Sequence, residues 1–280
     1  MSKRRVSLAL PRALLLATAG LVLVAALASA HDTWLLADRQ SVPVGTRLTL
    51  SMTSGMAFPK NETRIDPTRL KTATARLAGQ SSALRPMTSP QNALRLQAVL
   101  TKPGVATIWA SLKPRTLELT PKQVTEYLDE IGAPDSVRRL YVGVPQPPRW
   151  RERYTKYTKT YVAVGQGVRD SSWREPAGIG LEIVPLTDPT TIGVGDTLTI
   201  RVLRGGVPAP AFPISDVFAA EVSNRLVRTD SNGAAKLPAV RAGLWMLRGT
   251  DLRRPPSDVD ADWESMFSTL TLRVTPRRTR

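Results

Sequence analysis

The chain has 280 residues, with 39 Lys and Arg against 23 Asp and Glu, 42% hydrophobic residues, one His and no Cys. Without Cys, a disulfide framework, a thiolate zinc site, an iron–sulfur cluster and a cysteine nucleophile are excluded. A single His excludes a pair of imidazole ligands and the His-Glu-x-x-His zinc helix, and it allows at most one His-dependent triad. The length suits one large or two ordinary domains.

The N-terminal thirty residues have the three parts of a secretory signal peptide. Residues 3–5 are basic, residues 13–28 are largely apolar, and residues 28–30 read Ala-Ser-Ala, which is a small-x-small cleavage site. The alternative is an uncleaved anchor, because such a stretch, at ~1.5 Å per residue, nearly crosses a hydrocarbon core of about 30 Å. The polar residues 31–33 favour cleavage. We therefore predict a signal peptide over residues 1–30 and a soluble, periplasmic mature protein.

Alternation of apolar and polar residues predicts short strands in several segments. Residues 47–52, 94–99 and 197–202 alternate as strands with one buried side require. Gly, Pro, Asn and Asp separate these runs at positions typical of turns. Short strands with frequent turn signals favour antiparallel sandwiches.

One segment, residues 120–140, breaks the strand pattern and predicts a helix. Thr120 can cap it, Pro121 suits its first position, and four apolar residues between 124 and 131 share one face. Gly132 and Pro134 end this helix, and a second short turn follows over residues 135–140.

A stretch without clear periodicity, residues 166–180, divides the mature chain into two segments. We predict an N-terminal β-sandwich domain over residues 31–165 with the helical insertion near 120–140, a linker over 166–180, an immunoglobulin-like or transthyretin-like sandwich over 181–274, and a basic tail over 275–280. The second sandwich is expected to fold alone, with Trp245 and Trp263 in its core. The predicted fold class is therefore all-β, with two antiparallel β-sandwich domains and one short helical insertion.

Several short motifs occur in the order typical of one bacterial family. They are His31-Asp32-Thr33-Trp34-Leu35, the Gly-Met-Ala-Phe-Pro of residues 55–59, the helix at 121–128, the basic and aromatic residues 151–159, the apolar restart at 181–185 and the Asp-Trp-Glu-Ser of residues 262–265. Together they resemble the exported domain-of-unknown-function family DUF4198 over essentially the whole mature chain. The resemblance implies a secreted periplasmic protein with two β-sandwiches and a link to nickel or cobalt uptake or outer-membrane transport. It implies no established reaction.

His31 is the main candidate for a metal ligand. Cleavage after Ala30 would give His31 a free α-amine, and this amine and the imidazole Nδ1 form a favourable chelate for Cu(II) or Ni(II). The resemblance implies the same start, since members commonly begin the mature chain with His. Two nitrogens do not complete a site, so further ligands would come from Asp32, a distant carboxylate, a backbone amide, or the thioethers of Met52 and Met56. The alternative is a His placed by chance, with both methionines in the core.

An acidic segment is a second candidate site. Asp258, Asp260, Asp262 and Glu264 alternate as oxygen ligands do at the start of a calcium loop. An EF-hand is rejected because Trp263 stands where its Gly is required. A looser calcium site is the functional alternative to a solvated loop that Trp263 anchors to the core.

A basic and aromatic segment, residues 149–161, is the third candidate. In a strand, Tyr157, Lys159 and Tyr161 share one face, while Lys156 and Thr158 share the other. Interleaved cations and rings can bind nucleic acid, but export favours anionic lipid headgroups, lipopolysaccharide or an acidic protein. The alternative is a solvated strand whose tyrosines pack inward.

These observations favour a binding protein over an enzyme, because a carboxylate-only enzyme needs a pair of acids that no spacing identifies. We predict a periplasmic accessory protein that binds one divalent transition metal, nickel, cobalt or copper, through His31, with no catalytic residues. The predicted partners are a metal ion and an outer-membrane or metal transporter system, without nucleic acid and without a membrane span after cleavage. The alternative is a non-catalytic envelope interaction module that binds an acidic partner or an anionic glycolipid.

Overall fold

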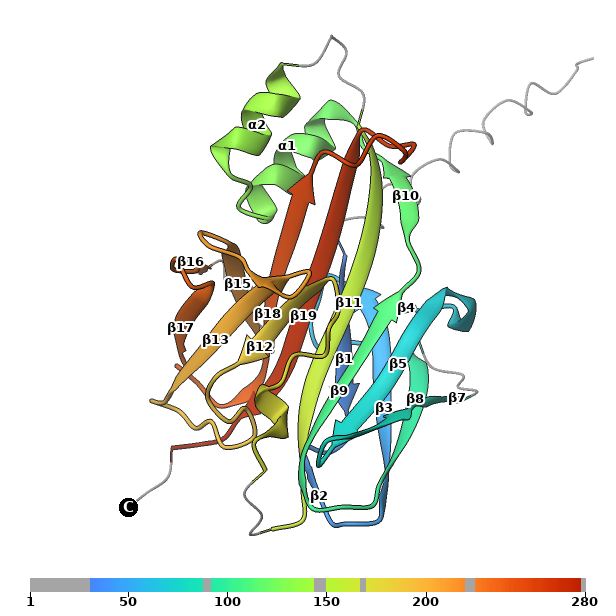
Figure 1. Ribbon diagram of the computed structural model, residues 1–280, viewed down its shortest axis with the longest axis vertical. Coiled ribbons are helices and arrows are strands. Elements are labelled where there is room, and N and C mark those ends of the chain that lie inside the picture. Colours follow the sequence, from blue (N-terminus) through green and yellow to red (C-terminus); the bar gives the residue numbers. More distant parts are fainter. Residues whose placement is uncertain (1–30, 88–91, 144–149, 167–169, 220–224, 278–280) are drawn as a thin grey trace, which may run out of the picture. The chain divides into compact units, whose positions relative to one another are not determined.

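The computed structural model of this chain consists mainly of β-strands (Figure 1). It describes residues 31–87, 92–143, 150–166, 170–219 and 225–277. The predicted signal peptide, the start of the basic aromatic segment at Arg149 and the end of the basic tail lie outside these ranges. The predicted fold class is confirmed, since the described strands form three largely antiparallel sheets with one helical insertion.

Sheet A contains N-terminal strands in the order β1-β3-β8-β7, with β4 beside β3. The strands predicted at residues 47–52 and 94–99 are confirmed as parts of β3 and β8. Their alternation buries Leu48 and Leu50 completely, and each such side chain contributes roughly 1.5–3 kcal/mol through burial. The bounds are β1 Asp32–Ala37, β3 Thr46–Gly55, β4 Thr63–Arg64, β7 Arg85–Met87 and β8 Leu94–Leu100.

Sheet B is the largest and draws strands from the whole described chain, in the order β16-β15-β18-β19-β11-β9-β5-β6, with β10 and β2 beside β11. The long central strand β11 pairs with β19 and β2 in parallel and with β9 and β10 in antiparallel orientation. The bounds are β2 Ser41–Val42, β5 Leu70–Leu77, β6 Gln80–Ala83, β9 Gly104–Leu112, β10 Arg115–Glu118, β11 Arg151–Val164, β15 Pro213–Phe218, β16 Leu226–Arg228, β18 Gly243–Arg253 and β19 Trp263–Val274.

Sheet C is a small sheet in which β13 pairs with β12, β14 and β17. The strand predicted at residues 197–202 is confirmed within β13, and its even-numbered apolar residues are buried. The bounds are β12 Leu181–Pro185, β13 Thr197–Arg204, β14 Val207–Pro208 and β17 Ala234–Pro238.

Sheet B is a middle layer, because its two faces pack against different sheets. On β11, Val162 joins the apolar core closed by sheet A, whereas Tyr161 joins the core closed by sheet C. On β19, Leu270 packs in the core with sheet C, while the Thr271 hydroxyl donates to the Leu35 carbonyl of sheet A at 2.5 Å. Two apolar cores therefore share one sheet.

The helical insertion forms two helices, α1 Pro121–Glu130 and α2 Asp135–Val142, as predicted. Thr120 and Gln123 form a capping box at the start of α1. Gly132 adopts a φ of +60° after α1, where a residue without Cβ is favoured. Short 3₁₀ turns occur at Pro67–Arg69 and Ser172–Arg174. Within the described ranges, no helix has the length and apolar character that a bilayer crossing requires.

The pairing of β11 with β19 connects the two predicted domains. β11 belongs to residues 31–165 and β19 to residues 181–274, yet they pair from Glu152 opposite Trp263 to Thr160 opposite Thr271. Residues His31–Arg280 form one compact unit. Independent folding of residues 181–274 stays a prediction, and the shared sheet argues against it.

Trp245 and Trp263 are both buried, but in different cores. Trp245 stacks on Phe218, with ring centroids 5.1 Å apart, in the core between sheets B and C. Trp263 stacks on Trp150, at 4.5 Å, in a third core with the helices. The prediction that Trp263 lies in the core of the second sandwich is therefore wrong, because β19 extends beyond sheet C to the helical insertion (Figure 1).

Candidate functional site

The predicted mature start lies where sheet A, sheet B and α1 meet. His31 directly precedes β1 and is partly buried. Its carbonyl oxygen accepts a hydrogen bond of 2.5 Å from the Nζ of Lys156, which stands on β11. The backbone of His31 is thus attached to the central sheet.

Lys156 is a buried lysine, 3% exposed. Its Nζ lies 5.5 Å from the ring centroid of Tyr154 and 5.4 Å from that of Phe267, and both rings favour a cation. No carboxylate of the described ranges lies within ion-pair distance of it. Burial lowers the pKa of Lys156 from 10.5 to about 8.

Asp32 is held on the other side of the same junction. Arg248 of β18 donates to the Asp32 carboxylate at 2.6 Å and to the Glu130 carboxylate, at the end of α1, at 3.0 Å. Burial raises the pKa of Glu130. In the sequence, Asp32 is a possible further metal ligand. Because its carboxylate already pairs with Arg248, it is a poor candidate for that role.

The His31 imidazole is favoured in its neutral form. Partial burial and the nearby Lys156 ammonium lower its pKa below 6.5, against the opposing effect of Glu62 and Asp32. Metal binding needs this neutral form. The Glu62 carboxylate accepts the backbone N–H groups of Met56 and Ala57 at 2.8 and 2.9 Å.

The two methionines considered as further ligands differ in position. Met52 is completely buried in the core between sheets A and B, so the core-filling alternative holds for it. Met56 is 60% exposed, in the loop after β3.

In the described part of the chain, no group of three or more His, Asp and Glu side chains is arranged to hold a metal ion. A site at His31 would therefore depend on the new α-amine and on ligands from solvent or a partner.

The acidic segment is a surface loop that leads into β19, and the carboxylates of Asp260 and Glu264 pair with arginine guanidiniums. Asp260 pairs with the Arg151 guanidinium at 2.6 Å, and Asp262 accepts from the Arg151 backbone N–H at 2.9 Å. Glu264 lies on β19 and pairs with Arg253 at 2.8 Å. An open hollow of about 400 Å³ lies beside Arg151 and residues 257–262. Arginines in contact with these carboxylates compete with a calcium ion, whereas the anchoring role predicted for Trp263 is confirmed.

The basic and aromatic segment is a buried central strand. The predicted division of its faces is confirmed, since Tyr161 packs toward sheet C and Lys156 points to the sheet A side. Lys156, Lys159 and Tyr161 are 3%, 2% and 1% exposed. The prediction that these cations and rings form a binding surface is therefore wrong. The alternative, a solvated strand whose tyrosines pack inward, is wrong about the solvation, because sheets pack on both faces, but the inward packing of Tyr154 and Tyr161 is confirmed.

Sequence reasoning missed the role of the two buried lysines. Lys159 forms a buried ion pair with Glu182 of β12, which is 1% exposed. Burial lowers the pKa of Lys159, against the opposing effect of Glu182. One signal was present in the sequence. Lys156 and Lys159 lie on opposite faces of an unusually long predicted strand, and a long strand is more often central than exposed.

Comparisons with known proteins give one clear relationship. The chain is similar to the solved structure of the D0-D1 domain of intimin at 15% identity, over 87% of this chain and 97% of that chain, with a TM-score of 0.22. It is similar to murine CEACAM1b at 10% identity, over 88% of this chain and 100% of that chain, with a TM-score of 0.21. An Escherichia coli adhesin, FdeC, matches at 12% identity over 90% of this chain and 65% of that chain, with a TM-score of 0.24. No curated protein matches the sequence. The model of the DUF4198 family, a domain of unknown function, matches residues 28–250, and the chain belongs to this family.

Proposed function

We propose that the protein is an exported, periplasmic accessory protein that binds a divalent transition metal, nickel, cobalt or copper, as cargo at its mature N-terminus. It works beside a metal-uptake or outer-membrane transport system and catalyses no reaction. The observation that carries the proposal is the attachment of His31 and Asp32 to the fold by Lys156 and Arg248, at the residue that follows the predicted cut.

The chemistry of an N-terminal His explains how a metal ion could be bound with only one side chain of the protein as ligand. The α-amine and the imidazole Nδ1 of one residue close a chelate ring, and both nitrogens must be unprotonated to bind. Partial burial and Lys156 already lower the imidazole pKa of His31. A chelate with few protein ligands binds its ion reversibly, which suits delivery to a partner.

The test starts with the exported protein, whose N-terminus is determined by intact mass and Edman sequencing. We expect it to begin His-Asp-Thr-Trp and to bind Ni(II), Co(II) or Cu(II) in titrations followed by calorimetry. A four-residue Gly-Ser-Gly-Ser extension before His31 moves the α-amine out of chelating reach of the imidazole but keeps the imidazole, so metal affinity should fall at least tenfold. His31→Ala keeps the amine and should have a similar effect.

Met87→Leu is the matched control, because this exposed thioether lies on β7, at the other edge of sheet A from β1, and outside the proposed chelate. Its affinity for Ni(II) should equal that of the unaltered protein. A cut at another residue, or an unchanged affinity in the extended protein, would overturn the proposed binding mode.

A further inference from the structure

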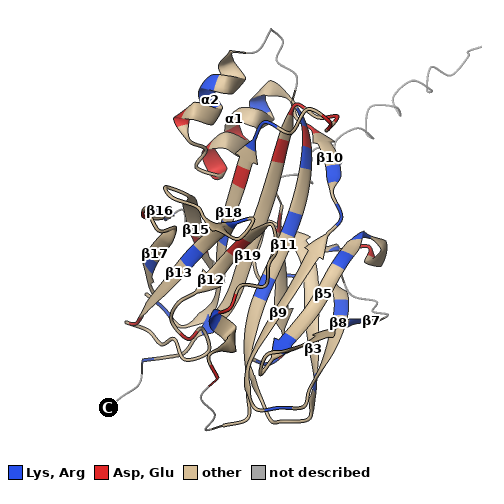
Figure 2. Ribbon diagram, in the orientation of Figure 1, with Lys and Arg blue, Asp and Glu red and all other residues tan. Residues whose placement is uncertain are grey.

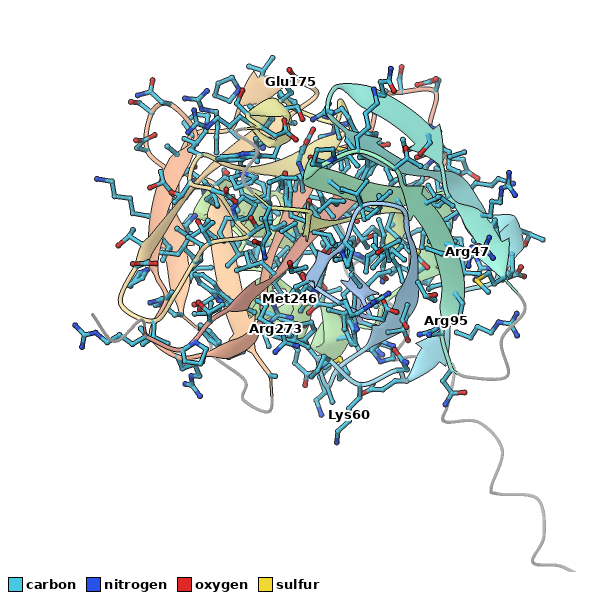
Figure 3. All side chains as sticks on the ribbon, turned by 90° about the horizontal axis from the view of Figure 1, so that it is seen from below. Arg47, Lys60, Arg95, Glu175, Met246 and Arg273 are labelled. Atoms are coloured by element: carbon cyan, nitrogen blue, oxygen red, sulfur yellow. The ribbon has the colours of Figure 1, made fainter. Side chains whose placement is uncertain are left out.

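The outer face of sheet A carries arginines that no apolar core covers. Along β3 and β8, Leu48, Leu50 and Leu96 point into the core between sheets A and B. Because successive residues of a strand point to opposite faces, Arg47 and Arg95 stand on the outer side. Figure 3 labels both residues.

Pairing register places three arginines on this side of three adjacent strands. Arg85 of β7 lies opposite Gln97 of β8, and Arg95 lies two residues before Gln97 on the same strand. Arg47 of β3 lies opposite Val99, two residues after Gln97. Arg85 and Arg95 are therefore diagonal neighbours, about 7–8 Å apart and within reach of each other's long side chains, while Arg47 is the diagonal neighbour of Gln97. We call Arg47, Arg85, Arg95, Gln97, Val99 and Met87 the arginine face.

The arginine face has no acidic side chains of its own. Strands β3, β7 and β8 contain neither Asp nor Glu, and Figure 2 shows basic residues but no acidic ones along β7 and β8. Among the described residues, no carboxylate forms an ion pair with any of these three arginines. Arg95 donates to the Ser51 hydroxyl, a neutral group that leaves its charge uncompensated.

Two exposed apolar side chains lie between these charges. Val99 is 53% exposed, opposite Arg47, and Met87 is 39% exposed, opposite Arg95. Guanidinium groups bind phosphate oxygens in a bidentate manner. Apolar side chains beside such arginines, here Val99 and Met87, can enter the interface of a bilayer while the arginines contact its headgroups. This combination fits a lipid surface better than a fully hydrated acidic protein.

We propose that the arginine face docks the protein on a membrane surface that displays anionic phosphate headgroups. The site is separate from His31, because Asp32 pairs with Gly55 at one end of β3, whereas Arg47 lies near the other end and the remaining arginines lie on β7 and β8. It therefore holds or fails independently of metal binding. Docking would bring a metal carrier to the membrane in which a transporter resides.

The test measures co-sedimentation of the exported protein with vesicles of phosphatidylcholine, with or without phosphatidylglycerol, at about 0.1 M salt. We expect binding only to the anionic vesicles. The triple variant Arg47→Gln/Arg85→Gln/Arg95→Gln should bind them roughly a hundredfold more weakly, since each basic residue near such a surface contributes about fivefold.

Matched controls separate a specific face from general basicity. Arg139→Gln/Lys236→Gln/Arg273→Gln removes the same charge from exposed residues of α2, β17 and β19, and it should weaken binding less than threefold. The double variant Arg47→Gln/Arg85→Gln keeps the Arg95 contact with Ser51 intact, so a folding defect is not expected, and it should weaken binding at least tenfold.

Two results would overturn the proposal. Equal losses in the two triple variants would show that net charge alone drives binding. The second result has two parts. Soluble polyglutamate displaces the protein fully from the vesicles, and neither Val99→Thr nor Met87→Ser changes vesicle binding. Together they would assign the face to an acidic macromolecule.

Discussion

The buried ion pair between Lys159 and Glu182 offers the sharpest test of how the two halves of the chain are joined. Lys159 stands on β11 and Glu182 on β12, on opposite sides of the predicted domain boundary. Glu182 also accepts the backbone N–H groups of Ala177 and Gly178 at 2.7 and 3.0 Å. The perturbation is Lys159→Met, which keeps the stem of the side chain and removes its charge.

The magnitude follows from what remains buried. Removing one partner of a buried ion pair costs ~3–5 kcal/mol, because the other charge is left uncompensated. In Lys159→Met, Glu182 keeps its two backbone donors, so we expect the lower end, about 3 kcal/mol. In the double variant Lys159→Met/Glu182→Gln, no buried charge remains, but Oε1 and Oε2 of Glu182 each accept one N–H group and the amide keeps only one of these oxygens. The loss should therefore be about 1–2 kcal/mol, the cost of one weakened hydrogen bond.

The assay is urea denaturation of the exported protein, followed by tryptophan fluorescence and far-UV circular dichroism, with free energies of unfolding from linear extrapolation. Glu182→Gln alone completes the double-mutant cycle. A loss below about 1 kcal/mol for Lys159→Met would show that the ion pair does not hold the two segments together as argued. So would a double variant as unstable as the sum of the single variants.

Two other predictions concern pH and domain structure. The pKa of Lys156 is about 8 in the folded protein and 10.5 for an ordinary, exposed lysine. Between these pH values the folded state therefore loses a proton that the unfolded state retains. Lys156 should therefore raise the free energy of unfolding by up to ~3 kcal/mol between these pH values, and Lys156→Met should remove this contribution. A pH titration of urea midpoints checks this, and equal profiles for both proteins would contradict it. A fragment of residues 178–280 lacks β11, the neighbour of β19 from Trp263 to Thr271, so we expect no cooperative denaturation transition. A cooperative circular dichroism melt would instead support independent folding of residues 181–274.

Local patterns predicted much of the secondary structure, because their physical causes lie within a few residues. The strand at 94–99 follows from strict alternation of apolar and polar side chains, and β8 has this pattern of burial. Thr120, Pro121 and Gly132 bound α1 through a cap, a permitted first position and a left-handed backbone. Signals of this kind need no knowledge of what the element later packs against.

The side chains of β11 that share a face could be predicted from the amino-acid order, since they follow from the two-residue period of a strand. What covers each face depends on segments that only the folded chain brings together. Sheet C brings Glu182 to Lys159 on one side, and the start of β1 brings the His31 carbonyl to Lys156 on the other. These contacts join residues 23 and 125 positions apart. The sequence predicts an exposed basic surface for this segment because alternation identifies only which residues share a face. Whether a face is buried depends on partners that are distant in the chain.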